Sequence, residues 1–157
     1  MSARRGGEQP AMSAKKLGHV VLRIRDLERS LAFYRDCLGL REVARLGPRM
    51  VFLSCGESHH DLALQALGPN APDADPAAVG LYHVAFKVGD SLEELSAMKK
   101  RLEAAGVPIL GASDHTVSKA LYLVDPDGIE VELYVDADPA IWKADPRAVA
   151  TVKPLKM

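Results

Sequence analysis

The chain of 157 residues has few features that would point to a membrane, an export pathway or a nucleic acid. Its apolar runs are far shorter than the about 20 residues that a transmembrane helix needs. The first sixteen residues carry charges without the apolar stretch of a secretory signal. The formal net charge of −1 lacks the basic footprint that nucleic acids or anionic membranes attract. We therefore expect a cytoplasmic protein with neither kind of partner.

Cysteine is also scarce. Cys37 and Cys55 are the only two, too few for a disulfide framework. Cys37 falls in a helical pattern and Cys55 ends an apolar strand, so both are predicted to be buried thiols in a reducing compartment. Neither has a histidine at a spacing that would suggest a nucleophile.

The first half of the chain alternates apolar and polar residues and then changes to a helical period. Val20, Leu22 and Ile24 share one face of a predicted strand, and Asp26 is a predicted helix cap. Gly39 stands where a helix commonly ends. The predicted elements are a strand at 17–25, a helix at 27–38, and strands at 40–45, 49–55 and 60–67.

The second half repeats this order after a segment rich in Pro, Ala and Asp. Ser91 and Glu94 have the spacing of a capping box, and the helix that follows is predicted to end at Gly106. An Asp-Pro-Asp-Gly turn at 125–128 joins the last two strands. Strands are predicted at 81–88, 107–110, 119–124 and 129–135, and the last twenty residues give no clear element.

The repeat extends to single residues. His19 and His83 occupy the same place in their strands, and each is followed seven residues later by an aspartate, Asp26 or Asp90. The sequence predicts an α+β fold in which two tandem βαβββ modules form a cupped mixed sheet around a shared metal cleft. The predicted divisions are a flexible tail at 1–15, one domain at 16–136 and a C-terminal extension at 137–157. Within that domain, module 1 is 16–67, the linker 68–79 and module 2 80–136.

Strand parity selects the residues that face this cleft. If the apolar faces pack against the helices, then His19, His83 and Glu132 point to the other side. Each residue alone has a common structural explanation, since most strand histidines are hydrogen-bonded and most surface glutamates are solvated. Two imidazoles at duplicated positions with one carboxylate, however, match the ligand set of a non-haem Fe(II) site with open coordination positions.

Four stretches, in this order and spacing, resemble the vicinal oxygen chelate superfamily. That superfamily includes glyoxalase I, bleomycin-resistance proteins and type I extradiol ring-cleaving dioxygenases, and the dioxygenases are the best match. The resemblance covers residues 16–136. Its stretches are GHVVLRIRDLERSLAFYRDCLGL at 18–40, SHHDLAL at 58–64, LYHVAFKV at 81–88 and ALYLVDPDGIEVELY at 120–134.

The resemblance implies an enzyme that cleaves a catechol-like diol with O₂ and holds Fe(II), or else Mn(II) or another divalent metal. It implies His19, His83 and Glu132 as metal ligands, which agrees with the parity argument. It also implies His60 as the acid/base histidine, with Tyr122 and His115 lining the cleft. In a regular strand His59 would face the cleft instead, unless a bulge intervenes. Exposed sheet edges make a homodimer the expected assembly.

Two alternatives stay open. A glyoxalase-type lyase or isomerase normally uses a fourth protein ligand, which would fall near Ala63 or Gln65. Alanine cannot bind a metal, and glutamine would bind it weakly. A non-catalytic drug-binding protein is the other alternative, although three Phe and one Trp leave little surface for stacking.

Overall fold

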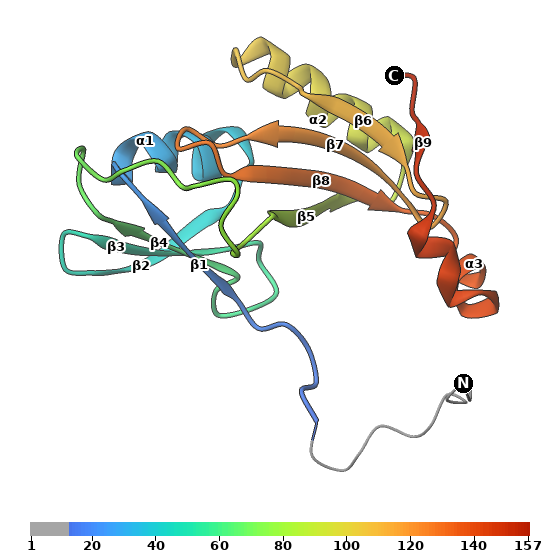
Figure 1. Ribbon diagram of the computed structural model, residues 1–157, viewed down its shortest axis with the longest axis horizontal. Helices are drawn as coiled ribbons and strands as arrows, with labels where there is room; N and C mark the ends of the chain where they lie inside the picture. Colours follow the sequence, from blue (N-terminus) through green and yellow to red (C-terminus); the bar gives the residue numbers. More distant parts are fainter. Residues whose placement is uncertain (1–12) are drawn as a thin grey trace.

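Two mixed sheets form the molecule (Figure 1), as seen in a computed structural model that describes residues 13–157. The first sheet has the order β1-β4-β3-β2, and the second has the order β5-β8-β7-β6-β9. In each sheet the first strand of the module runs parallel to the fourth, β1 beside β4 and β5 beside β8. The first-sheet strands are β1 (Val20–Ile24), β2 (Arg41–Leu46), β3 (Met50–Ser54) and β4 (Leu62–Ala66). The second-sheet strands are β5 (His83–Gly89), β6 (Gly111–Asp114), β7 (Ser118–Val124), β8 (Glu130–Asp136) and β9 (Lys153–Pro154).

This topology confirms the α+β fold and its internal repeat. The strands divide between two mixed sheets, of which the first belongs to module 1 and the second to module 2 with β9 added. The predicted tail falls mostly on residues 1–12, which lie outside the described residues. Between residues 13 and 157, no helix has the length and apolar character needed to cross a membrane.

Both predicted helices are present. Helix α1 (Leu27–Leu31) begins after Asp26, whose side chain accepts a hydrogen bond from the backbone N–H of Arg29. It continues as a π-helical turn, η1 (Ala32–Cys37), which the apolar spacing did not signal. Helix α2 (Leu92–Ala104) begins at the capping box, because Ser91 accepts from the Glu94 N–H and the Glu94 carboxylate accepts from the Asp90 N–H.

The apolar strand faces pack towards these helices. Leu22 and Ile24 are buried, whereas Val21 between them is 46% exposed. The same parity holds on β5, where Phe86 is buried. The buried side chains of both modules form one continuous core that includes residues of α1 and α2. Each sheet therefore has a core face and an opposite, open face.

One local prediction was wrong, because the strand predicted at 107–110 lies a few residues later, as β6. The C-terminal extension, for which the sequence indicated no clear element, contains α3 (Pro139–Ala144), the 3₁₀ helix η2 (Pro146–Ala150) and β9. Asp138 and Asp145 cap these short helices, each directly before a proline.

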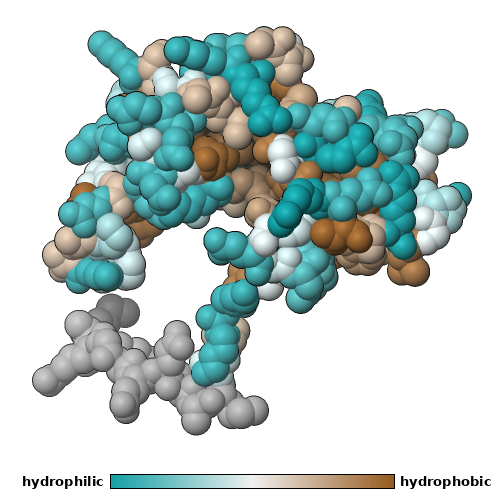
Figure 2. Space-filling model, turned by 180° about the vertical axis from the view of Figure 1, so that it is seen from behind, coloured by the Kyte–Doolittle hydropathy of each residue, from teal (hydrophilic) through white to brown (hydrophobic). Residues whose placement is uncertain are grey.

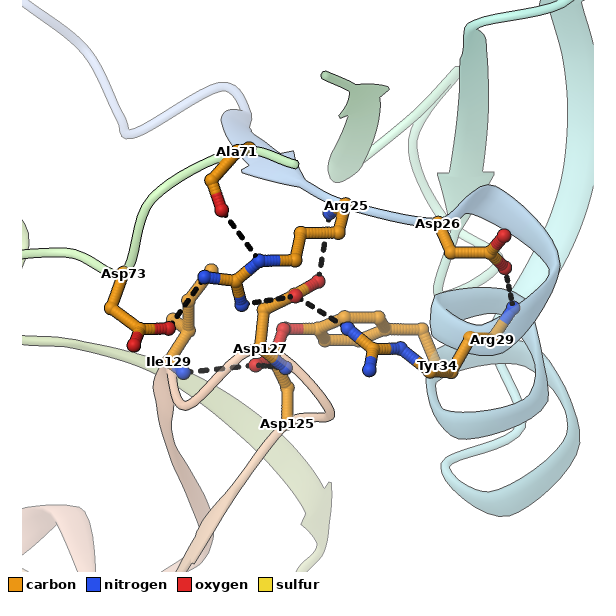
Figure 3. Close-up of polar contacts among 9 residues, drawn as sticks. All are labelled: Arg25, Asp26, Arg29, Tyr34, Ala71, Asp73, Asp125, Asp127 and Ile129. Carbon is orange, nitrogen blue, oxygen red and sulfur yellow. Dashed lines mark hydrogen bonds and ion pairs between the residues drawn. The ribbon is translucent and has the colours of Figure 1, made fainter. Parts of the chain in front are cut away.

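The two modules meet at a polar junction, which we define as Arg25, Arg29, Tyr34, Asp125 and Asp127 (Figure 3). The backbone N–H and guanidinium of Arg25 donate to Asp127 at 3.0 and 3.1 Å. Arg29 also donates to Asp127, whose side chain is only 6% exposed. The Tyr34 hydroxyl donates to Asp125 Oδ2 at 2.9 Å. These contacts hold the β1–α1 corner of module 1 against the β7–β8 turn of module 2.

Candidate functional site

The open face of the second sheet carries most of the predicted site. Tyr122 on β7 lies directly opposite Glu132 on β8, and His83 begins the neighbouring strand β5. His83 Nε2 is 3.0 Å from Glu132 Oε2. The His83 side chain is 30% exposed and that of Glu132 is 13% exposed. Strand pairing thus brings together an imidazole and a carboxylate that are 49 positions apart in the sequence.

The spacing of this pair suits a metal ion. Two ligand atoms at right angles, each about 2.1 Å from one ion, are about 3.0 Å from each other. The second ring nitrogen, His83 Nδ1, is buried without a hydrogen-bond partner in the described structure, although Glu130 Oε1 lies 3.4 Å away. Glu130, two positions before Glu132 on the same face of β8, therefore lies beside the imidazole. The donor set fits a divalent cation, with two ligands supplied by this module.

Tyr122 makes a second contact on the same face. Its hydroxyl lies 2.6 Å from His115 Nε2, in the turn between β6 and β7. Burial, followed by the charges of Glu132 and Glu130, raises the pKa of Tyr122. The phenol is therefore protonated at neutral pH. Four of the six predicted site residues, His83, Glu132, Tyr122 and His115, meet on one face.

The other two predicted residues, His19 and His60, meet on module 1. Their ring centroids are 4.3 Å apart, and the His60 ring also packs edge-on against Phe52 at 5.3 Å. His60 precedes β4 instead of lying within it, so strand parity does not decide between it and His59. Both histidines are close, with 2.6 Å between their Nδ1 atoms. Partial desolvation, and then His19 and His59, lower the pKa of His60, so its ring is neutral near pH 7.

His19 does not join His83 and Glu132 within the described chain. It lines a hollow of about 550 Å³ with residues 84–87 of β5. Seen from behind, apolar residues are exposed in the recess between two mainly hydrophilic lobes (Figure 2). Among residues 13–157, no three His, Cys, Asp or Glu side chains are close enough to hold one metal. The predicted ligands thus form two groups, one on each module.

A second hollow on the second sheet could not be predicted from the sequence. Its volume is about 280 Å³, and the C-terminal extension covers it with Trp142, Pro146 and Val149. Tyr134 lies in its floor, two positions beyond Glu132 on the same face of β8. Because these residues are separated along the chain, only the fold reveals that they belong together.

The cysteines are not part of the site. Both thiols are free; Cys37 is partly buried and Cys55 is exposed, so the prediction of two buried thiols was wrong. Partial burial of the thiol, and then the Asp61 carboxylate, raise the pKa of Cys55 to about 11. Such a thiol is protonated at neutral pH and is a poor nucleophile.

Comparison with known proteins gives a consistent family. A model of the Glyoxalase/Bleomycin resistance protein/Dioxygenase superfamily matches residues 16–133. The catechol-2,3-dioxygenase of Bacillus subtilis (strain 168) is 36% identical over 129 residues, which are 82% of this chain and 44% of that protein. The biphenyl-2,3-diol 1,2-dioxygenase 3 of Rhodococcus globerulus is 36% identical over 127 residues, which are 77% of this chain and 63% of that protein. This chain thus spans about half the length of these relatives.

Solved structures agree on the fold. The crystal structure of lactoylglutathione lyase from Agrobacterium tumefaciens superimposes with a TM-score of 0.62 at 29% identity, covering 83% of this chain and 98% of that one. This chain is thus similar in sequence to proteins named for ring cleavage and in fold to a protein named for lyase chemistry. The fold alone does not select between those activities.

Proposed function

This chain belongs to the Glyoxalase/Bleomycin resistance protein/Dioxygenase superfamily, and from that premise we propose that it is a metal-dependent extradiol-type dioxygenase. Its substrates would be a catechol-like diol and O₂. The observation that carries the proposal is the His83–Glu132 pair, 3.0 Å apart, with Tyr122 and His115 on the same open sheet face. The ring-cleaving relatives support the reaction type.

The metal would be held by His83 and Glu132 together with His19. Fe(II) is the first candidate and Mn(II) the second, because two imidazoles and one carboxylate leave coordination positions open. When bound, the metal would supply the redox chemistry that joins O₂ to the diol. The residues of this chain would bind and orient the diol and move its protons.

His60 and Tyr122 would handle the protons. A neutral imidazole is able to accept a proton from a diol hydroxyl, and the lowered pKa of His60 keeps it neutral near pH 7. Tyr122 lies opposite Glu132 on the same sheet face, and its hydroxyl would hydrogen-bond a diol oxygen. The role of His60 requires it to face the second sheet, although it lies on module 1.

A second copy of the chain would meet this requirement. His19 and His60 lie on module 1, whereas His83 and Glu132 lie on the open face of module 2. We propose a homodimer in which module 1 of each copy covers the open sheet face of the other. Each of the two sites would then combine residues from both chains.

A complementation experiment tests this arrangement. His19→Ala and His83→Ala should each bind no stoichiometric iron and show no turnover as homodimers. Mixing the two after partial unfolding should restore about a quarter of the wild-type sites, because half of the dimers are mixed and each has one intact site. A mixture that stays inactive while each single variant still forms dimers would exclude the shared site.

The reaction itself is tested by anaerobic reconstitution with Fe(II) and a panel of catechols, followed by O₂ uptake and visible absorbance of the product. Glu132→Ala should lose both iron and uptake. His60→Ala should retain iron and lose turnover, since it is proposed to move a proton and not to hold the metal. Turnover of a hemithioacetal without O₂ consumption would instead indicate the lyase alternative.

A further inference from the structure

The C-terminal extension lies beyond the residues matched by the family model, which end at 133. The fold nevertheless attaches it firmly to the sheet that carries the candidate site. Strand β9 pairs with β6, and the Leu155 N–H donates to the Ala112 carbonyl. The Leu155 side chain packs against the core. This attachment brings residue 151 next to the turn between β6 and β7.

The Thr151 backbone carbonyl contacts a site residue directly. Its oxygen lies 3.0 Å from Nδ1 of His115. A carbonyl oxygen can only accept a hydrogen bond, so Nδ1 must carry the hydrogen. In the neutral ring the other nitrogen, Nε2, is then an acceptor. The Tyr122 hydroxyl, 2.6 Å from Nε2, must be the donor in that second bond.

The β6–β7 turn holds His115 in place for this contact. The His115 N–H donates to the Ser118 carbonyl, and the Val117 N–H donates to the His115 carbonyl. Thr116 has a φ of +70°, which a β-branched residue adopts only where its surroundings impose it. Its N–H donates to Asp114 Oδ1 at 2.7 Å. The position of His115 is therefore fixed from the turn and from the extension.

We propose that Thr151 is a positioning residue that fixes His115 as the Nδ1–H tautomer and thereby sets the direction of the Tyr122 hydrogen bond. Because Tyr122 donates its one hydroxyl hydrogen to His115, it presents only lone pairs to the open face. A ligand hydroxyl beside Glu132 would donate to Tyr122 instead of accepting from it. This last step rests on the proposed diol substrate, whereas the tautomer does not.

The tautomer can be measured on the metal-free, full-length chain by long-range ¹H–¹⁵N NMR of the imidazole rings. The His115 signals are assigned by their loss in His115→Gln. We expect the Nδ1–H pattern near neutral pH, whether or not any diol is turned over. An Nε2–H pattern for His115 in the full-length chain would overturn the proposal.

Two variants locate the cause in the backbone of residue 151. Thr151→Ala keeps the carbonyl and should leave the Nδ1–H pattern unchanged. A chain that ends after Ala150 lacks the carbonyl and should change to the Nε2–H form. If the shortened chain does not fold, the wild-type and Thr151→Ala spectra still decide; a change of tautomer in Thr151→Ala would contradict the backbone assignment.

A kinetic measurement separates this inference from the proposed function. If the Fe(II)-loaded protein turns over a diol, the chain ending after Ala150 should lose about tenfold in kcat with a smaller change in KM. Unchanged kinetics would overturn the positioning role. If the tautomer is confirmed but the protein has no ring-cleaving activity, the positioning role of Thr151 stands and only the proposed dioxygenase function is excluded.

Discussion

Replacing Tyr34 with Phe would test whether the polar junction holds the modules together. The change removes one hydroxyl and keeps the ring, so packing should be preserved. Tyr34 is fully buried and Asp125 is 3% exposed, and their hydrogen bond is 2.9 Å long. The other donors to Asp125, the N–H groups of Asp127 and Ile129, reach Oδ1, so the substitution takes the donor from Oδ2.

The expected loss is about 2 kcal/mol of the free energy of unfolding at pH 7, since a hydrogen bond to a charged group contributes about 1.5–3 kcal/mol. For a chain of this size the melting temperature should fall by about 4–8 °C. Tyr134→Phe is the matched control, because Tyr134 lies on β8 and not at the junction. Tyr134→Phe should lower the free energy of unfolding by less than about 0.5 kcal/mol.

The pH dependence gives the sharper test. Burial, and then the Asp125 charge, raise the pKa of Tyr34 well above its ordinary value of 10.0. Below pH 10 the phenol is protonated in both states, and its contribution is fully present. Above pH 10 the unfolded chain loses this proton while the folded chain keeps it, so stability falls by up to about 1.4 kcal/mol per pH unit. Tyr34→Phe lacks this loss, so the difference in the free energy of unfolding between wild type and the variant should narrow above pH 10.

Urea unfolding followed by circular dichroism at pH 7 to 11 measures both quantities. The raised pKa values of Tyr122 and Tyr134 also lower wild-type stability at alkaline pH, but they act equally in the variant and cancel in the difference. A loss of less than about 0.5 kcal/mol in the free energy of unfolding at pH 7 would refute the assigned role of the Tyr34–Asp125 bond. So would a difference between wild type and Tyr34→Phe that stays constant through pH 11.

Two further substitutions test local features. Thr116→Gly should raise the free energy of unfolding by about 1 kcal/mol in urea titrations, because glycine adopts a positive φ without strain; an equal loss would show that Thr116 is not strained. Gly89→Ala should lower the free energy of unfolding, measured in the same urea titrations, by about 1–3 kcal/mol, because a Cβ there would lie 2.7 Å from atoms of Glu94. An unchanged free energy would mean that the Glu94 side chain of the capping box shifts without cost.

The sequence predicted most of what depends on nearby residues. Asp26 and Ser91 begin their helices because their side chains reach N–H groups three positions later, a local contact. Parity put His83 and Glu132 on one face because a strand alternates with a period of two. The 3.0 Å contact itself also requires β5 to pair with β8, which joins distant parts of the chain.

What could not be predicted depends on contacts between distant residues. The Arg25–Asp127 pair joins positions 102 apart, and nothing near either residue identifies its partner. The packing of the modules, and hence the separation of His19 from His83, follows from such contacts. The Thr151 contact is made by a backbone carbonyl, which every residue has, so no side chain in the extension marks it.

The open face of the second sheet also has an electrostatic reason to bind a cation. Glu130 and Glu132 lie two positions apart on one strand face, about 7 Å between their backbones, with His83 between their carboxylates. Polar groups at the junction are paired, since Asp125 and Asp127 each accept at least three hydrogen bonds. His83 Nδ1, in contrast, is buried without a hydrogen-bond partner in the described structure, although Glu130 Oε1 lies 3.4 Å away. A divalent ion held by His83 Nε2 and Glu132 would balance the two neighbouring carboxylates, so the charge of this face and the spacing of the pair both support the proposed metal.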